Sequence, residues 1–459
     1  MSVQEVAPVV PAQGRRFRAY TTKHLEKLTA RAGLPEAERL AVRAVATVLP
    51  FRTNDYVIES LIDWSAAPDD PIYRLVFPQA DMLPAEDIAP IAAMLASGAP
   101  ERDIQAAARD VRMRLNPHPA GQLALNVPAL ADEPVPGVQH KYPETILVFP
   151  KQGQTCHAYC TYCFRWAQFV GEPDLKMATD DMYRVTAYLR AHPEVTSVLI
   201  TGGDPMIMGA GVLRRYIEPL LGPGMEQIES IRIGTKSLAY WPQRFVGDPD
   251  ADDTLQLFEQ VAAAGKTLAL MAHFSHPREL EPAQVTTAIS RIQATGAVIR
   301  TQAPLIRTIN DCPAAWSQMW RTQLRLGLVP YYMFVERDTG PQGYFAVPLA
   351  RATEIFRDAY STVSGLCRTV RGPSMSATPG KVCVDGVAEI GGQRVFVLHM
   401  IQARDPSLVG HPFFAEFDPN AVWLSDLRPA FADRFPFEVG APRPGESGGS
   451  WDRRLLATG

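Results

Sequence analysis

Between residues 142 and 362, short apolar runs alternate with helical patterns six times, and this alternation constrains the fold most. We predict strands at 145–149, 197–201, 230–234, 267–272, 297–302 and 328–334. We predict helices after them at 178–192, 211–221, 253–264, 282–295, 314–326 and 348–362. Strands joined by crossovers of this length are parallel and connected right-handedly. Because the strands are continuously apolar, the sheet should be covered on both faces. The sequence therefore predicts an α/β fold, an incomplete (β/α)6 version of the eight-fold barrel.

The segments that flank the alternation predict smaller additions. Helical patterns occupy 20–65 and 84–115, and Pro-rich stretches at 117–120 and 128–136 indicate a linker. After residue 365 the sequence turns rich in Gly, Pro and Ser over 370–390, with one more strand expected at 394–402. We expect loose tails at 1 to about 15 and from 428 onward. The predicted division is a helical N-terminal region at 1–140, the partial barrel at 141–365 and a small C-terminal extension at 366–459.

Composition excludes several classes of protein. The 459 residues are 46% hydrophobic and 20% charged, as in ordinary globular proteins. The net charge of −4 argues against a dedicated nucleic-acid binder. No apolar run approaches a membrane span, and the first twenty residues lack a signal-peptide pattern. We expect a cytoplasmic protein with no membrane partner.

Three of the six cysteines stand in one short loop directly after the first predicted strand. Cys156, Cys160 and Cys163 have the spacing C-x3-C-x2-C. Three thiolates can hold three irons of a cubic [4Fe-4S] cluster, which leaves the fourth iron without a protein ligand. A small chelating molecule with an amine and a carboxylate can occupy that iron, and S-adenosylmethionine (SAM) has both groups. The loop is therefore a candidate cluster site at the carboxyl edge of the sheet.

The cysteine loop has two other interpretations, a structural zinc site and a redox pair. A structural zinc site would need a fourth ligand, and the nearest candidate is His157, immediately beside Cys156. A redox pair of Cys160 and Cys163 would leave Cys156 unexplained. In a reducing compartment, clustered cysteines are metal ligands more often than disulfide partners.

Several motifs together resemble one enzyme family. They are Lys141-Tyr142-Pro143, the cysteine loop followed by Phe164-Arg165, TGGDP at 201–205, IRIGT at 231–235, HFSHP at 273–277, Asn310-Asp311-Cys312, Pro330-Tyr331-Tyr332 and Pro379-Gly380-Lys381. Over roughly 140–390 the chain resembles a radical SAM enzyme of the lysine 2,3-aminomutase family. The resemblance implies a [4Fe-4S] cluster, SAM and pyridoxal 5′-phosphate (PLP) as cofactors.

The resemblance assigns roles along the strand ends. Gly202 and Gly203, flanked by Asp204, match the glycine motif that meets the amino group of SAM, although two glycines after a strand also form ordinary tight turns. His273 and Gln302 should lie near the adenosyl group or the substrate.

The resemblance also assigns the PLP and carboxylate sites. Lys381, in a loop rich in Pro and Gly, matches the lysine that joins PLP, and a loop reaching over the barrel mouth would bring it to the site. Lys141 is the candidate for the PLP phosphate, and Arg165 for the substrate carboxylate. Two departures stand out: 376–380 replaces the family's run of glycines, and Thr145 replaces a basic residue.

Substrate choice is where the sequence departs most. The two aspartates that hold the distal ammonium in lysine-specific members correspond to Arg337 and Ser374. Arg337 would repel an ammonium and attract a carboxylate, which favours an acidic amino acid such as glutamate. A shift of one residue would instead place Asp338 in the site.

The remaining cysteines predict no second metal centre of the family type. Some lysine-specific members join the cysteine of the Asn-Asp-Cys motif to a C-terminal cysteine cluster through zinc. Cys312 is present, but no cysteine follows Cys383, so we expect no such zinc. Cys367 and Cys383 are interpreted as ordinary buried thiols.

The sequence thus predicts a radical SAM, PLP-dependent amino acid 2,3-aminomutase. It would be served by an electron donor such as flavodoxin or ferredoxin, and we expect a homo-oligomer. One alternative is a PLP-independent enzyme of the same fold that performs hydrogen abstraction, dehydration or epimerisation; Thr145 and the altered 376–380 segment favour it. A non-enzymatic metal or interaction protein is the other, and the strand-end polar residues count against it.

Overall fold

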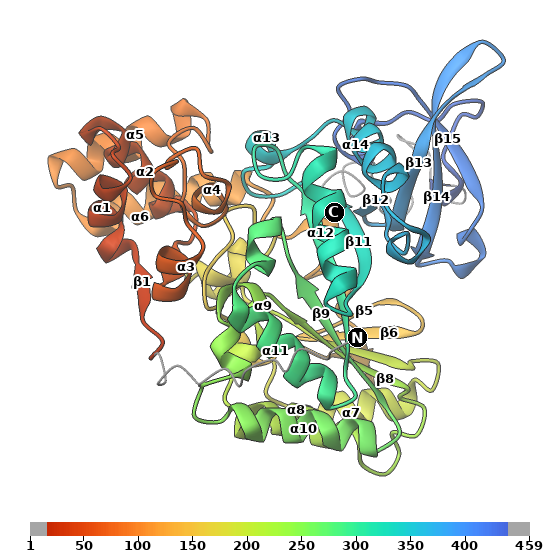
Figure 1. Cartoon of the computed structure of the whole chain (residues 1–459). Helices are drawn as coiled ribbons and strands as arrows, with labels where there is room; N and C mark the ends of the chain where they lie inside the picture. Colours follow the sequence, from red (N-terminus) through yellow and green to blue (C-terminus); the bar gives the residue numbers. More distant parts are fainter. Residues whose placement is uncertain (1–15, 439–459) are drawn as a thin grey trace, which may run out of the picture.

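The computed structural model describes residues 16–438. Its N-terminal part contains a two-stranded sheet of β1 (Ala19–Thr21) and β2 (Arg52–Asn54) and a group of helices. The helices are α1 (Thr22–Arg31), α2 (Glu36–Val48), α3 (Asp55–Ser60), α4 (Pro71–Val76), α5 (Ala85–Ser97) and α6 (Glu101–Arg114). They gather at one end of the molecule, drawn in red and orange in Figure 1. Gly98, which ends α5 in the left-handed conformation, and Pro100, which precedes α6, separate the two helices.

The six predicted strands form one parallel set within a single large sheet. They are β6 (Thr145–Val148), β7 (Ser197–Ile200), β8 (Ser230–Thr235), β9 (Thr267–His273), β10 (Val298–Leu305) and β11 (Val329–Val335), and each pairs in parallel with the next. This arrangement confirms the α/β prediction. Its cause is the apolar content of the strands: β9 is buried along its centre, and in β7, β8 and β11 buried residues alternate with partly exposed ones.

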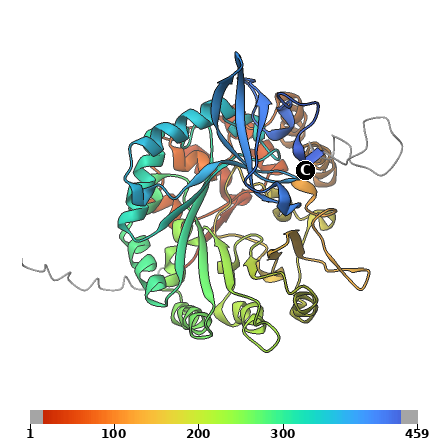
Figure 2. The same ribbon diagram turned by 90° about the vertical axis from the view of Figure 1, so that its right-hand side faces the viewer.

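The expected helices connect these strands. They are α7 (Met182–Ala191), α8 (Ala210–Ile217), α10 (Ala251–Ala263), α11 (Ala283–Ala294), α12 (Pro313–Arg325) and α14 (Leu349–Ser361), with short α9 (Ser237–Tyr240) and α13 (Gln342–Phe345) added after β8 and β11. In Figure 2 the helices that follow the strands lie outside the curve of the sheet. Among the described residues, no helix is long and apolar enough to cross a membrane.

The sheet continues beyond the parallel set at both edges. β5 (Val138–Tyr142) pairs antiparallel with β6, and β12 (Arg371–Ser376) pairs in parallel with β11. β13 (Gly380–Ile390), β14 (Gln393–Ala403) and β15 (Pro412–Glu416) then follow as antiparallel strands, which makes eleven strands in one sheet. A separate small hairpin joins β3 (Ala129–Leu130) to β4 (Glu133–Pro134).

The prediction that Lys381 lies in a Pro- and Gly-rich loop is wrong, since β12 and β13 occupy most of 370–390. β12 pairs with β11 and β13 pairs with β14, so the backbone of this segment is hydrogen-bonded within the sheet. The side chains of Val382 and Val384 are buried. Tertiary pairing therefore outweighs the composition of the segment. Lys381 is a strand residue, next to the start of β13, and not a loop residue.

Within the described residues, three hydrophobic cores underlie this architecture. One packs α12 and α14 against β10 and β11 and includes Trp316, Met333 and Ile355. The other two differ in size. The larger joins the N-terminal helices to the parallel strands from β6 to β10 and their helices. A smaller core lies under the C-terminal strands and includes Met375, Val382, Phe396 and Trp423. The predicted tail before about residue 15 and most of the tail after 428 lie outside the described residues.

Candidate functional site

A cavity of about 330 Å³ opens at the carboxyl ends of the parallel strands. The sequence predicts the site at this edge, where loops after successive strands converge. Its walls include most of the proposed site residues: Lys141, Cys156, Cys160, Cys163, Arg165, Gly202, Gly203, Asp204, His273, Gln302, Arg337 and Lys381. Residues separated by up to 240 positions in the chain therefore face one space.

The N-terminal helices hold the cysteine loop from behind. Asn54 at the end of β2 donates to the carbonyl oxygen of His157 at 3.2 Å. The amide of Tyr159 donates to the carbonyl of Arg52 at 2.8 Å, and that of Thr161 to the carbonyl of Leu75 at 3.0 Å. These contacts fix the backbone of the loop. The cysteines are therefore held in place although the loop has no regular secondary structure.

The three cysteine thiols are half-buried beside the cavity. Burial raises the pKa of all three thiols, that of Cys163 to about 12. A metal must therefore displace their protons when it binds. Within residues 16–438, the three sulfur atoms do not all lie within 4.8 Å of one another. One zinc ion keeps its sulfur ligands at most about 4.6 Å apart, whereas a cubic cluster spreads them more widely.

His157 is not placed to complete a zinc site. Its Nδ1 lies 3.0 Å from the hydroxyl of Ser237, and its ring stacks on Trp241. Burial lowers the pKa of His157 to about 3, so the ring is neutral. The ring thus belongs to the packing behind the loop, which removes the fourth ligand from the zinc interpretation.

Gly202 and Gly203 allow the turn after β7 to touch the cysteine loop. Gly202 has a φ of +141°, a region that favours glycine. A Cβ atom on Gly203 would lie 2.4 Å from the carbonyl oxygen of Thr155. The amides of Gly203 and Asp204 donate to the carbonyls of Gly153 and Thr155 at 3.1 and 2.8 Å. The two glycines therefore join the turn to the loop that carries the cysteines, whether or not a ligand is bound.

The carboxylate of Asp204 is occupied by the protein itself. Its oxygens accept from the amides of Met206 and Lys236, both at 2.9 Å, and from the hydroxyls of Thr235 at 2.7 Å and Ser237 at 3.1 Å. Burial raises its pKa, while these hydrogen bonds act in the opposite direction. Asp204 thus ties the turn after β7 to the turn after β8, and positions Gly202 and Gly203.

His273 and Gln302 lie side by side on neighbouring strands. The amide nitrogen of Gln302 lies 2.7 Å from Nε2 of His273, so Nε2 accepts when the ring proton is on Nδ1. Burial and the charge of Lys236 lower the pKa of His273 to about 3. Lys236 is neutralised by Glu279 at 2.8 Å. The far end of the cavity is therefore a polar wall without net charge.

Lys381, the second residue of β13, also lines the cavity. Its Nζ donates to the side-chain oxygen of Gln402 at 3.1 Å and lies 4.2 Å from the centre of the Tyr332 ring. Burial, with the charges of Arg232 and Arg371, lowers the pKa of Lys381 to about 7. A desolvated lysine near other cations is a nucleophilic amine at neutral pH.

Further cations line the same cavity. Lys141 donates to the carbonyl of Ala377, and its pKa is well below the ordinary value because of burial and neighbouring cations. The guanidinium groups of Arg165 and Arg337 lie 4.8 and 5.0 Å from the centre of the Phe164 ring. Burial and Arg337 lower the pKa of Arg165 to about 9.

Several of these cations have N–H groups without a partner. In the described part of the chain, Nη1 of Arg165, Nε and Nη2 of Arg337 and Nε of Arg232 are buried and make no hydrogen bond. Buried donors of this kind are rare in folded proteins unless a ligand satisfies them. An anionic ligand with carboxylate or phosphate oxygens fits this wall.

Two proposed substrate residues are not brought to the cavity wall as the structure describes it. Ser374 is fully buried in β12, and its hydroxyl donates to the carbonyl of Met333 at 3.4 Å. Asp338 follows Arg337 but lies behind the cavity wall, where its carbonyl accepts from Asn116 at 2.7 Å and burial raises the carboxyl pKa to about 6. Packing of the β11–β12 pair thus corrects the assignment of Ser374 to the site.

The cavity also contains residues that the sequence analysis did not single out. Arg232, Glu336 and Gln402 line it. Arg232 could have been noticed as a charged residue inside an otherwise apolar strand. Gln402 has no such signal, because only the pairing of β13 with β14 places it opposite Lys381.

The chain is similar to proteins of known description. No family model matches the chain. A protein described as "Putative L-lysine 2,3-aminomutase" from Aquifex aeolicus is 30% identical over 401 residues, 87% of this chain and 93% of the relative. "L-lysine 2,3-aminomutase" from Clostridium subterminale is 28% identical over 237 residues, and that alignment spans about half of each chain, 51% and 53%.

A solved radical SAM methyltransferase from Sphaerobacter thermophilus is 16% identical over 77% of this chain and 93% of the other, with a TM-score of 0.36. That score is too low to establish a shared fold. The Aquifex relative, which aligns along nearly its whole length, is sufficient to identify the family. The chain therefore belongs to the lysine 2,3-aminomutase family of radical SAM enzymes.

Proposed function

We propose that this protein is a PLP-dependent amino acid 2,3-aminomutase whose substrate is an acidic amino acid rather than lysine. The observation that carries the proposal is the composition of one cavity. Cys156, Cys160 and Cys163 line it together with Lys381, whose pKa is about 7, and with arginines whose buried donors have no partner among the described residues. We also infer that the curved parallel strands are the partial barrel of the radical SAM fold.

When bound, the cluster with SAM supplies the radical that removes a hydrogen atom, and PLP supplies the conjugated system that carries the migrating nitrogen. Cys156, Cys160 and Cys163 would hold the cluster. The turn at Gly202 and Gly203 would border SAM, because it packs against the same loop.

His273 and Gln302 would meet the uncharged part of SAM or the substrate. Burial keeps His273 neutral, and Lys236 beside it is paired with Glu279, so this end of the cavity offers polarity without a net charge. Such a wall can orient a neutral adenosyl group through hydrogen bonds without attracting an anion to the wrong end of the site.

PLP would be attached at Lys381. The amine of Lys381 is largely neutral at pH 7 to 8 because its pKa is about 7, and Gln402 orients it at 3.1 Å. Lys141 would contact the phosphate. The departure at Thr145 is compensated in space, since Arg232 reaches the Thr145 hydroxyl at 3.4 Å and brings a cation to that position. This geometry supports PLP over the PLP-independent alternative.

Arg165 and Arg337 would hold two carboxylates of one substrate. Both guanidinium groups lie over the ring of Phe164, and both have N–H groups free for a ligand among the described residues. Arginine matches carboxylate geometry through two parallel hydrogen bonds. An ammonium at the same place would face several buried cations, which disfavours lysine as substrate.

The test is anaerobic incubation of the reconstituted protein with SAM, a reductant and single amino acids, followed by chiral chromatography and mass spectrometry. We expect a β-amino isomer of unchanged mass from glutamate. Consumption of the substrate to a dehydrated or epimerised product would favour the PLP-independent alternative. Isomerisation of lysine ahead of glutamate would disprove the substrate assignment.

A further inference from the structure

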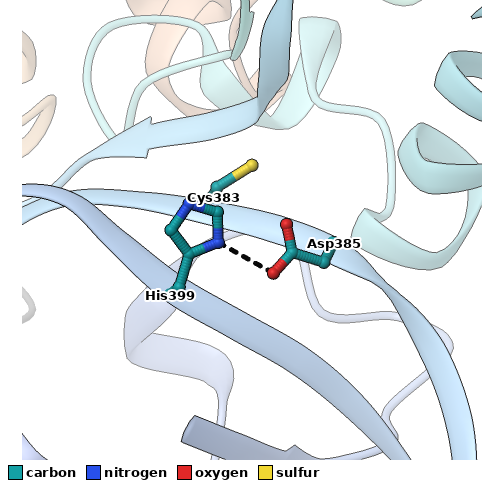
Figure 3. A group of neighbouring side chains, drawn as sticks. All are labelled: Cys383, Asp385 and His399. Atoms are coloured by element: carbon teal, nitrogen blue, oxygen red, sulfur yellow. Dashed lines mark hydrogen bonds and ion pairs between the residues drawn. The ribbon is translucent and has the colours of Figure 1, made fainter. Parts of the chain in front are cut away.

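The hairpin β13–β14 brings together a thiol, a carboxylate and an imidazole outside the cavity. Cys383 on β13 lies directly opposite His399 on β14 in the antiparallel ladder. Asp385 is the extra residue of a β-bulge in β13, between Val384 and Gly386, which pair with consecutive residues of β14. Residues 383 and 385 share one face of the strand, so the three side chains converge (Figure 3).

The distances within this group suit one metal ion. One ligand atom of each side chain lies within 4.8 Å of the other two. Nδ1 of His399 lies 2.8 Å from a carboxylate oxygen of Asp385. Sulfur, nitrogen and oxygen ligands around one zinc ion lie at most about 4.5 Å apart. Small side-chain rotations are therefore sufficient to bring all three into bonding distance.

The chemistry of the three side chains also suits a cation. The Asp385 carboxylate lies 2.8 Å from Nδ1 of His399 and close to the buried Cys383 thiol. A divalent ion would replace the thiol proton and balance the charges of a thiolate and a carboxylate.

We propose that Cys383, Asp385 and His399 bind a zinc ion. Thiolate, imidazole and carboxylate are the ligands zinc prefers, and three protein ligands leave a fourth position for water. The side chains of Asp385 and His399 are 43% and 31% exposed, so the ion can enter from solvent. Cys383 is buried on the inner side.

The ion would fasten the two strands that carry the Lys381 contact. Cys383 is two residues from Lys381 on β13, and Gln402, the partner of Lys381, is three residues from His399 on β14. None of the three ligands lines the cavity as the structure describes it. The site is therefore structural, and it stands or falls independently of the proposed aminomutase activity.

The test is the zinc content of the full-length protein with its cluster reconstituted. The protein is incubated with micromolar zinc, desalted over a chelating resin and analysed for zinc and iron by mass spectrometry. Wild type should retain one zinc per chain. Cys383→Ser should lose it, and Asp385→Asn and His399→Gln should each weaken binding by at least roughly tenfold.

Controls separate this site from the other cysteines. Cys312→Ser and Cys367→Ser should retain zinc, and so should a variant in which Cys156, Cys160 and Cys163 are all replaced by alanine. Zinc should also protect Cys383 of the wild type from alkylation, as read by peptide mapping. If Cys383→Ser fails to fold, the half-exposed His399→Gln variant decides the test.

Three results would overturn the proposal. Wild type that retains no zinc, or zinc content equal in Cys383→Ser and wild type, would reduce the group to an Asp385–His399 ion pair beside a buried thiol. Loss of zinc only when the three loop cysteines are replaced would assign the metal to that loop.

Discussion

The two sides of the cavity satisfy their polar groups in opposite ways. On the side built by the ends of β7, β8 and β9, the Asp204 carboxylate accepts four hydrogen bonds from protein groups and Lys236 is paired with Glu279. On the side around the Phe164 ring, Arg165 and Arg337 keep buried N–H groups unpaired among residues 16–438.

The difference indicates a division of labour. A wall whose polar groups are already paired fixes geometry, and here it fixes the turn that supports the cysteine loop. Unpaired buried cations are costly unless an anion arrives, because desolvation disfavours each of them. We therefore expect changes on the first wall to stop SAM cleavage, and changes on the second wall to stop amino acid turnover while SAM binding persists.

The largest effect should follow from loss of one cysteine ligand. Cys156→Ala, Cys160→Ala and Cys163→Ala should each reduce 5′-deoxyadenosine formation to background, because a three-thiolate site has no spare ligand. Product is measured by chromatography after anaerobic reconstitution. Cys312→Ser, at an exposed position, is the matched control and should keep wild-type formation. Near-normal formation in any of the three variants would contradict the cluster assignment.

The next largest effect should come from loss of Lys381, the buried amine that we propose joins PLP. Lys381→Ala should abolish the isomerisation and the pyridoxyl label that borohydride fixes to the wild type, while SAM binding persists. Lys151→Ala, an exposed lysine, is the control and should take up the label normally. Because the amine must be neutral to react, the labelling rate should fall as the pH drops below about 7. Label on another peptide would contradict the assignment.

The same pKa predicts a dependence of stability on pH. Lys381 has a pKa of about 7 in the folded protein, below its ordinary value of 10.5. Between these values the unfolded chain holds the additional proton, so the contribution of Lys381 to the free energy of unfolding rises with pH. In the PLP-free protein, Lys381→Met should therefore stabilise more at pH 7 than at pH 10, by on the order of 1 kcal/mol. Thermal melts at both pH values measure this difference.

Arg337→Asp should change substrate selectivity. A buried ammonium about 4 Å from Arg337 is disfavoured by up to about 4 kcal/mol at an effective dielectric constant of 20. A carboxylate gains roughly 1.5–3 kcal/mol from charge-assisted hydrogen bonds. The ratio of kcat/KM for glutamate over lysine should therefore fall by about 100-fold or more in Arg337→Asp. Arg351→Gln on exposed α14 is the control, and an unchanged ratio in Arg337→Asp would exclude Arg337 as the reader of the side chain.

Gly203→Ala tests whether the turn after β7 supports SAM cleavage by positioning the cysteine loop. The new Cβ would lie 2.4 Å from the Thr155 backbone, so the cysteine loop must shift. Overpacking of this kind costs about 1–3 kcal/mol, and we expect roughly tenfold slower SAM cleavage. Gly211→Ala in α8 is the control, since among the described residues no atom lies within 4 Å of its added Cβ. Equal activity in the two variants would show that the loop yields without consequence.

The sequence was sufficient to predict the parallel half of the fold because local pattern and tertiary structure agree there. Apolar strands such as β7 and β9 are followed by helices with a clear apolar face, and the polar residues that end them meet at one edge. The antiparallel extension was not predictable in the same way. β12 and β13 contain Gly and Pro, and only pairing with β11 and β14 makes them strands.

For the site, the sequence indicated residues whose chemistry is unusual for their surroundings and missed those whose role depends on pairing. The cysteine spacing and the glycines after β7 are local signals. The contact of Gln402 with Lys381 and the position of Arg232 beside Thr145 arise from strand register. Alignment to a family likewise could not show that the Ser374 hydroxyl bonds the Met333 carbonyl, because the pairing of β11 with β12 determines that contact.

Ser374→Ala should have the smallest effect, and it separates position in an alignment from position in space. The Ser374 hydroxyl donates to the Met333 carbonyl at 3.4 Å, a long hydrogen bond, and the fully buried side chain is not part of the cavity lining as the structure describes it. Its loss should cost about 1 kcal/mol of stability. The glutamate-to-lysine ratio should stay within about twofold of wild type, since no substrate contact is removed. A change of that ratio comparable to the effect of Arg337→Asp would mean that β12 turns Ser374 toward the substrate. Ser374 would then be a substrate-binding residue beside Arg337.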